Sequence, residues 1–314
     1  MKRMAIMANI EESTPARPHI FIQTNAKQSI GAIVSAYSLK RYSRHADEFD
    51  VTVMHQEDYP YFRAGEGRTY IRHGVKRTWR NDDLQSFTLL RFMPPELMDY
   101  RGRALVVDPD VFAVGDVWEL LTRDMAGKAI LCRRSAHKRN AFATSVMLLD
   151  CEKLKHWNVE RGFNELLALK RDYDDWMSLR MEPPGTIGRI ENEWNDFDRL
   201  TPKTRMVHNT RRRTQPWKTG LPVDYTPTEF VPVIGWLMRA RRALFGDHGM
   251  LGRYARHPDP NQEHLFFGLL RECVESGLIA EAALRNAMAN NYIRHDALDV
   301  IARVPPLQAM TAAA

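Results

Sequence analysis

The chain has 314 residues, 44% of them hydrophobic, with a formal net charge of +6 and three cysteines. This length and content allow one large α/β core with an appendage of about 100 residues and exclude a largely disordered protein. The cysteines are widely spaced and no run of about 18 apolar residues occurs, so we expect reduced thiols, no membrane span and a cytoplasmic location. The positive charge suits nucleic acid, an anionic membrane or a phosphate-bearing substrate, but without a recognised reader motif we expect no nucleic-acid partner.

Strands and helices are expected to alternate along the first third of the chain. The runs at 20–22 and 49–54 have the β-branched and aromatic content of strands, while apolar side chains recur at helical spacing in residues 29–42. A Tyr-, Arg- and Gly-rich stretch at 59–70 predicts a loop, and a proline pair interrupts the helix expected at 84–98. This order of elements predicts a mostly parallel, doubly wound α/β sheet.

A short apolar strand followed by two carboxylates is the most informative stretch. Residues 105–107 are apolar without alternation, which is typical of a strand buried on both faces. Asp108 and Asp110 follow it and point the same way if the backbone is extended, with Pro109 restricting φ between them. Such a pair at the carboxyl end of a parallel strand suits Mg²⁺ or Mn²⁺ beside a nucleotide. The same pattern also occurs in turns whose aspartates cap the next element.

The second half adds more candidate ligands. An acidic run occupies residues 172–177, and His208 directly follows a short strand expected at 205–207. The other expected elements of this part are strands at 128–132 and 145–150 and helices at 116–123, 151–157 and 162–170.

The character of the sequence changes beyond Gly220. Helical patterns occupy residues 231–245 and, as two or three helices, residues 261–303. The expected organisation is a leader, an α/β domain and a helical C-terminal region, at residues 1–18, 19–220 and 221–314.

Four stretches in this order resemble family 8 nucleotide-sugar glycosyltransferases. They are Phe87-Thr-Leu-Leu-Arg91-Phe92 followed by Pro95-Glu96-Leu97; Ala104 to Val111; Ser145 to Asp150 with Leu154 and Trp157; and Val207-His208 through Gln215-Pro216-Trp217. The resemblance spans residues 19–220. It implies the GT-A fold, a divalent cation that is usually Mn²⁺, and transfer of a sugar from a nucleoside diphosphate donor, expected to be a UDP-sugar, to a hydroxyl acceptor with retention of configuration. The acceptor is expected to be a glycan, with a cell-envelope glycan as one candidate.

The resemblance also assigns roles to particular residues. It makes His208 the third metal ligand beside Asp108 and Asp110, holding Mn²⁺ or Mg²⁺ against the diphosphate, where a cation stabilises the leaving group. Asp174 and Asp175 are the candidates for catalytic carboxylates near the reacting sugar. The predicted donor-binding residues are Thr24, Asn25, Arg91, Asp108, Gln215 and Trp217.

The chain departs from the family pattern at three places. Ala143-Thr144-Ser145 stands where the family has Asn-Ala-Gly, so the Asn that touches the donor sugar is lost. The loop after His208 is one residue longer and has Gln215-Pro-Trp in place of Lys-Pro-Trp, with Arg211 to Arg213 as substitutes for the missing lysine charge. The acidic run lacks the family's Gln.

Two other classes of function remain open. A catalytically degenerate sugar-binding or scaffold protein would tolerate the lost Asn and Gln. A haloacid-dehalogenase phosphotransferase also places Asp-x-Asp after an apolar strand, but it favours Thr or Val at the position of Phe112 and has the pair near the start of its domain.

One segment of the C-terminal region predicts a membrane contact. In residues 235–245, arginines alternate with Trp236 and Phe245 at near-helical spacing, a pattern of helices that lie on anionic membranes. A helix docked on the main domain with its arginines outward is the alternative. We therefore expect a cytoplasmic protein that can be peripheral at the inner face of the membrane.

Overall fold

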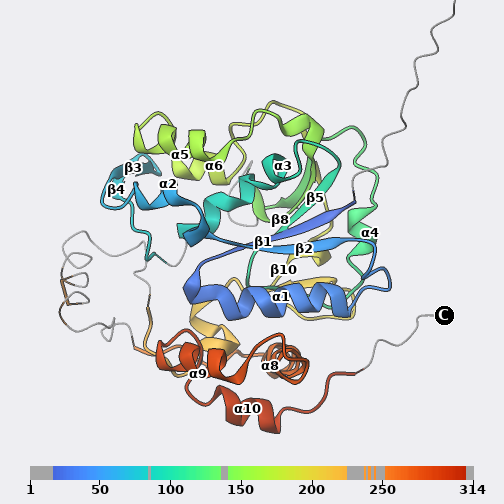
Figure 1. Ribbon diagram of the computed structural model, residues 1–314. Helices are drawn as coiled ribbons and strands as arrows, with labels where there is room; N and C mark the ends of the chain where they lie inside the picture. Colours follow the sequence, from blue (N-terminus) through green and yellow to red (C-terminus); the bar gives the residue numbers. More distant parts are fainter. Residues whose placement is uncertain are drawn as a thin grey trace, which may run out of the picture.

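The computed structural model describes residues 17–83, 86–135, 141–224 and 252–308, together with positions 237, 240, 241 and 244. Most of the predicted leader and most of the predicted membrane-contact segment at 235–245 lie outside the described residues. Figure 1 shows helices on both faces of a central sheet, with the helices of the C-terminal region on the side of one face.

Six strands form the central sheet in the order β2-β1-β5-β8-β7-β9. β1 pairs in parallel with β2 and β5, β7 pairs in parallel with β9, and β8 alone runs antiparallel to its neighbours. The predicted mixed α/β architecture with a mostly parallel sheet is therefore confirmed. The strands are β1 (His19–Thr24), β2 (Asp50–His55), β5 (Arg103–Val107), β7 (Ile130–Arg134), β8 (Phe142–Asp150) and β9 (Ile187–Arg189).

Both faces of this sheet are covered by apolar side chains. In β5, Val106 faces one core while Leu105 and Val107 face the other, which explains why the strand shows no polar alternation. Helix α1 (Ser29–Arg41) covers the second face through Ala32 and Leu39. The first face is covered by α5 (Val159–Leu167), α6 (Tyr173–Met177) and the segments near them.

The predicted loop at 59–70 is wrong in part. It contains the short helix α2 (Pro60–Arg63), and its end begins a hairpin of β3 (Thr69–Arg72) and β4 (Val75–Thr78). The two turn residues, His73 and Gly74, have φ of 54° and 71°, the conformation of a two-residue hairpin turn that Gly favours. The weak alternation of the two four-residue strands hid this hairpin from pattern analysis.

Several expected helices are shorter than predicted. The segment expected at 84–98 is a 3-10 helix, η3 (Ser86–Phe92), followed by α3 (Pro94–Leu97), because prolines at 94 and 95 start a new helix. The helix expected at 116–123 is α4 (Trp118–Leu121), and the helix expected at 151–157 is the 3-10 helix η4 (Cys151–Leu154).

A second, three-stranded sheet extends the chain beyond the aspartate pair. It has the order β10-β11-β6, formed by β10 (Asp196–Phe197), β11 (Met206–His208) and β6 (Val111–Ala113). α1 supports β6 directly, because Ser35 Oγ donates to the Val111 carbonyl at 2.6 Å and Ser38 Oγ accepts from the Ala113 amide at 2.9 Å. A Cβ on Gly31 would lie 2.8 Å from the Pro109 carbonyl oxygen, so this close approach requires glycine.

The helices expected after residue 260 are α8 (Pro260–Glu275), α9 (Glu281–Ala289) and α10 (Ala297–Arg303). Their buried side chains form one cluster with Val34 of α1, Phe112 of β6 and Trp217. The predicted helical C-terminal region thus shares a core with the α/β domain. No helix within the described ranges is long and apolar enough to span a membrane.

Candidate metal and donor site

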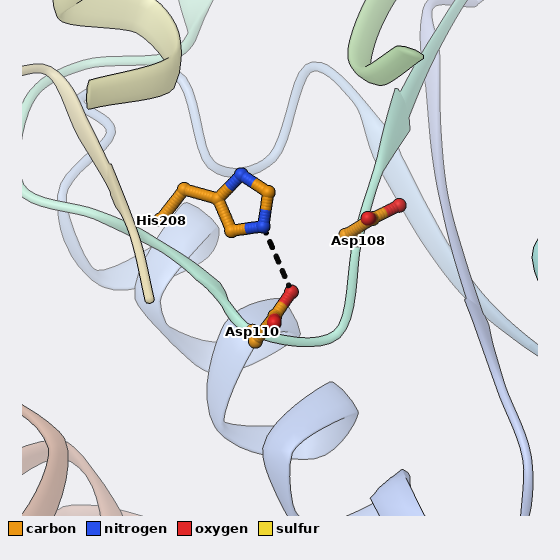
Figure 2. A group of neighbouring side chains, drawn as sticks. All are labelled: Asp108, Asp110 and His208. Carbon is orange, nitrogen blue, oxygen red and sulfur yellow. Dashed lines mark ion pairs between the residues drawn. The ribbon is translucent and has the colours of Figure 1, made fainter. Parts of the chain in front are cut away.

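The aspartate pair lies where β5 ends, and a second strand brings His208 beside it (Figure 2). β11 pairs antiparallel with β6 in a register that sets His208 opposite Val111, the residue after Asp110. One ligand atom from each of Asp108, Asp110 and His208 lies within 4.8 Å of the other two. Among the described residues this is the one cluster of His, Cys, Asp and Glu side chains that meets that condition.

Hydrogen bonds fix the orientation of the buried His208 ring. Asn195 donates through Nδ2 to Ser145 Oγ at 2.8 Å, so its Oδ1 accepts from His208 Nδ1 at 2.9 Å. With a proton on Nδ1 in this arrangement, Nε2 faces Asp110 Oδ1 at 3.3 Å. Burial lowers the pKa of His208, but the Asp110 carboxylate outweighs it and the pKa is raised. In its neutral form the ring presents a lone pair toward the carboxylates, as a metal ligand must.

Asp108 is buried and held by two side chains. Arg91 donates to both of its carboxylate oxygens, with Nε 2.9 Å from Oδ1, and Gln23 donates to Oδ1 as well. Burial raises the pKa of Asp108, and the Arg91 guanidinium acts in the opposite direction. In its ionised form the carboxylate can accept all of these hydrogen bonds, and Oδ2 retains a lone pair for a cation.

Asp110 is held by the segment that follows β11. Gln215 Nε2 donates to Asp110 Oδ2 and to the Asn209 carbonyl, both at 3.2 Å. Trp217, only 4% exposed, packs edge-on against Phe112 at 5.8 Å between ring centroids. The structure thus places Gln215 beside the candidate metal ligands and Trp217 in the apolar core; donor contacts by either remain predictions.

The end of β1 forms the neighbouring part of the site. Thr24 and Asn25 are buried there, and Asn25 Nδ2 donates to the Asp83 carbonyl and to Ser86 Oγ, both at 3.3 Å. Within the described structure, Asn25 Oδ1 and Gln23 Oε1 are buried without a hydrogen-bond partner. Buried acceptors of this kind are costly unless a ligand donates to them.

Two residues that replace the family's Ala-Gly have defined contacts. Thr144 accepts from Arg91 Nη1 at 3.0 Å and donates to the Met177 carbonyl at the end of α6 at 2.9 Å. Ser145 is the partner of Asn195 described above. Thr144 thus links Arg91 to α6, and Ser145 supports the histidine.

The predicted catalytic carboxylates lie on α6. Asp172 caps the helix by accepting from the Asp174 amide at 2.7 Å. Asp174 is 3.3 Å from His73 Nε2 in the β3–β4 turn, and the more exposed Asp175 pairs with Arg180 at 2.7 Å. The structure does not bring either aspartate into the metal cluster, and their catalytic role stays a prediction.

The arginine loop, Arg211 to Arg213, follows β11. Arg211 is exposed, and its amide donates to Asp198 Oδ1 at 3.1 Å. The Arg213 carbonyl accepts from the Ala255 amide at 2.8 Å, which ties the loop to the chain returning before α8.

The residues present fit a hard divalent cation. Two carboxylates and one imidazole are ligands that Mn²⁺ accepts and that Mg²⁺ accepts in part. The sequence predicted this triad; it missed Gln23, Asn195 and Thr144. The place of Gln23 directly before Thr24-Asn25 was the available signal, whereas nothing local marks Asn195.

Comparisons with protein-family models and with curated proteins found no match. Solved structures similar to this chain include the glycosyltransferase GlyE of Streptococcus pneumoniae TIGR4, with 14% identity over 70% of this chain and a TM-score of 0.46. The match covers 60% of the GlyE chain, so this chain spans less than two thirds of that length. The galactosyltransferase LgtC, solved with donor and acceptor sugar analogs, has 14% identity over 63% of this chain and 89% of its own, with a TM-score of 0.43. Mouse xyloside xylosyltransferase 1 has 13% identity over 62% of this chain and 98% of its own, with a TM-score of 0.40.

Proposed function

We propose that this chain is a metal-dependent glycosyltransferase that moves a sugar from a nucleoside diphosphate donor to a hydroxyl acceptor. The observation that carries the proposal is the Asp108, Asp110 and His208 cluster at the carboxyl end of β5, where open α/β sheets bind nucleotides. Its support includes the two buried amide oxygens at the end of β1 that lack a partner in the described chain.

The residues divide into three tasks. Asp108, Asp110 and His208 would hold Mn²⁺ or Mg²⁺, which when bound neutralises the charge on a departing diphosphate. Thr24 and Asn25 lie at the end of β1 and would contact the nucleoside, because Asn25 Oδ1 can accept from a base or ribose. The resemblance to family 8 makes uridine the proposed nucleoside. Arg91 would hold Asp108 in place and contribute positive charge.

The stereochemistry and acceptor are further parts of the proposal. We infer retention of the anomeric configuration from the resemblance to family 8 glycosyltransferases, with a leaving phosphate oxygen taking the acceptor proton, a scheme that needs no strong general base. Asp174 and Asp175 would stabilise positive charge developing at the anomeric carbon. The arginine loop, Arg211 to Arg213, would approach the diphosphate and exclude water. A glycan hydroxyl is the expected acceptor.

The test is a screen followed by product analysis. Nucleotide-sugars are screened by thermal shift with and without Mn²⁺, and the stabilising donor is incubated with simple glycosides. NMR assignment of the product anomer should show the donor configuration. Inverted product would contradict the retaining mechanism.

A non-catalytic sugar-binding protein is the second candidate. Ala143 in place of the donor-contacting Asn favours it. Donor binding without transfer or hydrolysis for any nucleotide-sugar would support this candidate against the enzyme.

We also propose a peripheral contact with an anionic membrane through residues 235–245, which fits a cytoplasmic protein at the inner membrane face. The support is the arrangement of arginine and aromatic residues in the sequence. Liposome flotation tests it: recovery should require anionic lipid, and equal recovery with neutral lipid, or none with either, would contradict the contact.

A further inference from the structure

One face of the β3–β4 hairpin gathers arginines. The register pairs Tyr70 with Arg77 and Arg72 with Val75, so Arg72 and Arg77 are diagonal neighbours on the same face. Diagonal neighbours have their Cα atoms about 7–8 Å apart, within reach of one ligand for two side chains as long as arginine. The hairpin also carries Arg68 and Lys76, which makes it strongly basic.

Arg72 is hydrogen-bonded to Tyr70 and lies near the charge of Asp83, but no carboxylate among the described residues forms an ion pair with either arginine. Both arginines are half-buried, and within the described part of the chain the Nε atom of each is buried without a hydrogen-bond partner. Arg72 lies over the Tyr173 ring, 4.7 Å from its centroid. That cation–π contact offsets only part of the cost of desolvating the guanidinium. Two neighbouring guanidinium groups that are half-buried, with no ion pair in the described chain, favour an anion that both can bind.

The hairpin adjoins the proposed reaction site. Asp172, the cap of α6, accepts from the amides of His73 and Gly74 at 3.2 and 2.8 Å, so the turn is fastened to α6. Tyr173, the next residue, shares a hydrogen bond with Thr88 through its hydroxyl, and Thr88 lies on η3, the element that also carries Arg91. A ligand of Arg72 would therefore lie near the segment that positions Arg91.

We propose that Arg72 and Arg77 form an anion-binding site that recognises a phosphate or carboxylate group of the acceptor. This inference rests on the proposed function, since it assigns the acceptor class of the same site. A phosphate of the donor diphosphate is the other anion that Arg72 and Arg77 could bind. The printed contacts connect Arg72 to the metal cluster only indirectly, through Tyr173 and η3, and this favours the acceptor.

The first test uses sulfate as a probe for a tetrahedral anion. Melting temperature is measured against sodium sulfate, with ionic strength kept constant by sodium chloride, in the presence of saturating UDP and Mn²⁺. Sulfate should stabilise the parent in a saturable way. In the Arg72→Gln/Arg77→Gln variant its apparent dissociation constant should rise by about 10-fold or more. Arg101→Gln, a change at a 70% exposed side chain, is the matched control and should behave as the parent.

Each other outcome contradicts the inference in a distinct way. If UDP and Mn²⁺ abolish the sulfate effect in the parent, the anion belongs to the donor diphosphate. Absence of any sulfate-specific stabilisation, or an equal effect in the double variant, would rule out the site. If the double variant does not fold by circular dichroism, Arg72→Lys replaces it, since lysine keeps the charge but loses bidentate binding.

The sulfate titration can be repeated without UDP and Mn²⁺, so failure of the proposed donor binding remains distinguishable from failure of the anion site. Where turnover is found, the double variant should raise KM for a phosphorylated or carboxylated acceptor about 10-fold and leave KM for the neutral analogue and for the donor unchanged. An equal rise for both acceptors would contradict specific recognition of the anionic group.

Discussion

At the scale of single residues, the state of His208 depends on a partner far from it in sequence. The Asn195 side chain donates to Ser145 Oγ through its amide nitrogen, which leaves its amide oxygen to accept from His208 Nδ1. The Ser145 hydroxyl thus sets the orientation of Asn195, and Asn195 sets the tautomer of the histidine. Such outer partners of metal-binding histidines raise affinity by fixing the ring.

Replacing Asn195 should weaken metal binding more than it weakens the fold. Asn195→Ala frees the His208 ring, and we expect Mn²⁺ affinity, measured by calorimetry, to fall by about 10- to 100-fold. Asn195→Asp keeps an acceptor at Nδ1 and should restore most of the affinity. Asn158→Ala removes the half-buried asparagine that caps α5, away from the metal cluster, and should cost stability alone. Unchanged Mn²⁺ affinity in Asn195→Ala would show that the histidine is not a ligand.

The sequence predicted the residues whose chemistry is local. Asp108 and Asp110 stand two residues apart at a strand end, which the sequence shows directly, whereas His208 is assigned as their partner from the family resemblance. Asn195 and Thr144 could not be found this way, because their roles depend on strand register and on contacts between distant segments. Trp217 was assigned from a motif, and the structure places its ring in the core.

At the scale of elements, the hairpin and α6 hold each other. Asp172 accepts from three backbone amides, those of His73, Gly74 and Asp174. Burial raises the pKa of Asp172, but these hydrogen bonds outweigh burial and lower it below its usual value. The sequence predicts a loop at 59–70 and no strand directly after it, because two four-residue strands give too short a pattern to recognise.

Removing the Asp172 carboxylate should loosen this unit. Asp172→Ala is expected to cost about 1–2 kcal/mol in the free energy of unfolding at neutral pH, measured with urea. Because the folded pKa lies below the unfolded value of about 3.9, the contribution is complete above that pH and is lost as pH falls through the folded pKa. The difference between variant and parent should therefore shrink in acid.

Asp175→Ala is the matched control on the same helix. Its ion pair with Arg180 is 46% exposed at the aspartate, so its removal should change stability by no more than about 0.5 kcal/mol. A loss for Asp172→Ala that is as small as the control, or that grows as pH falls, would contradict the role of the cap.

At the scale of the whole molecule, the C-terminal helices are joined to the α/β domain through α1. Arg41 donates to Glu272 of α8 with Nη2 at 2.9 Å from Oε1, and the Tyr37 hydroxyl donates to the same carboxylate at 2.9 Å. Burial, together with the hydrogen bond to Glu272, raises the pKa of Tyr37 to about 12. The sequence predicted helices in this region, but periodicity within a helix does not reveal which surface it covers.

Cutting this connection should destabilise the whole chain. Glu272→Ala leaves Arg41, with only 13% of its side chain exposed, without its counter-ion, and we expect a loss of about 1–3 kcal/mol in the free energy of unfolding. Glu275→Ala on the same helix removes an exposed pair with Arg271 and should be nearly neutral. Equal effects of the two variants would show that the α1–α8 contact adds little to stability.

The central claim is that the aspartate pair and His208 hold a divalent cation on which nucleotide binding depends. Isothermal titration calorimetry of UDP into the protein, with and without Mn²⁺, tests it in the parent and in Asp110→Ala. Measurable UDP binding should require Mn²⁺ in the parent and be lost in the variant. If Asp110→Ala binds UDP and Mn²⁺ as tightly as the parent, the proposed site is wrong.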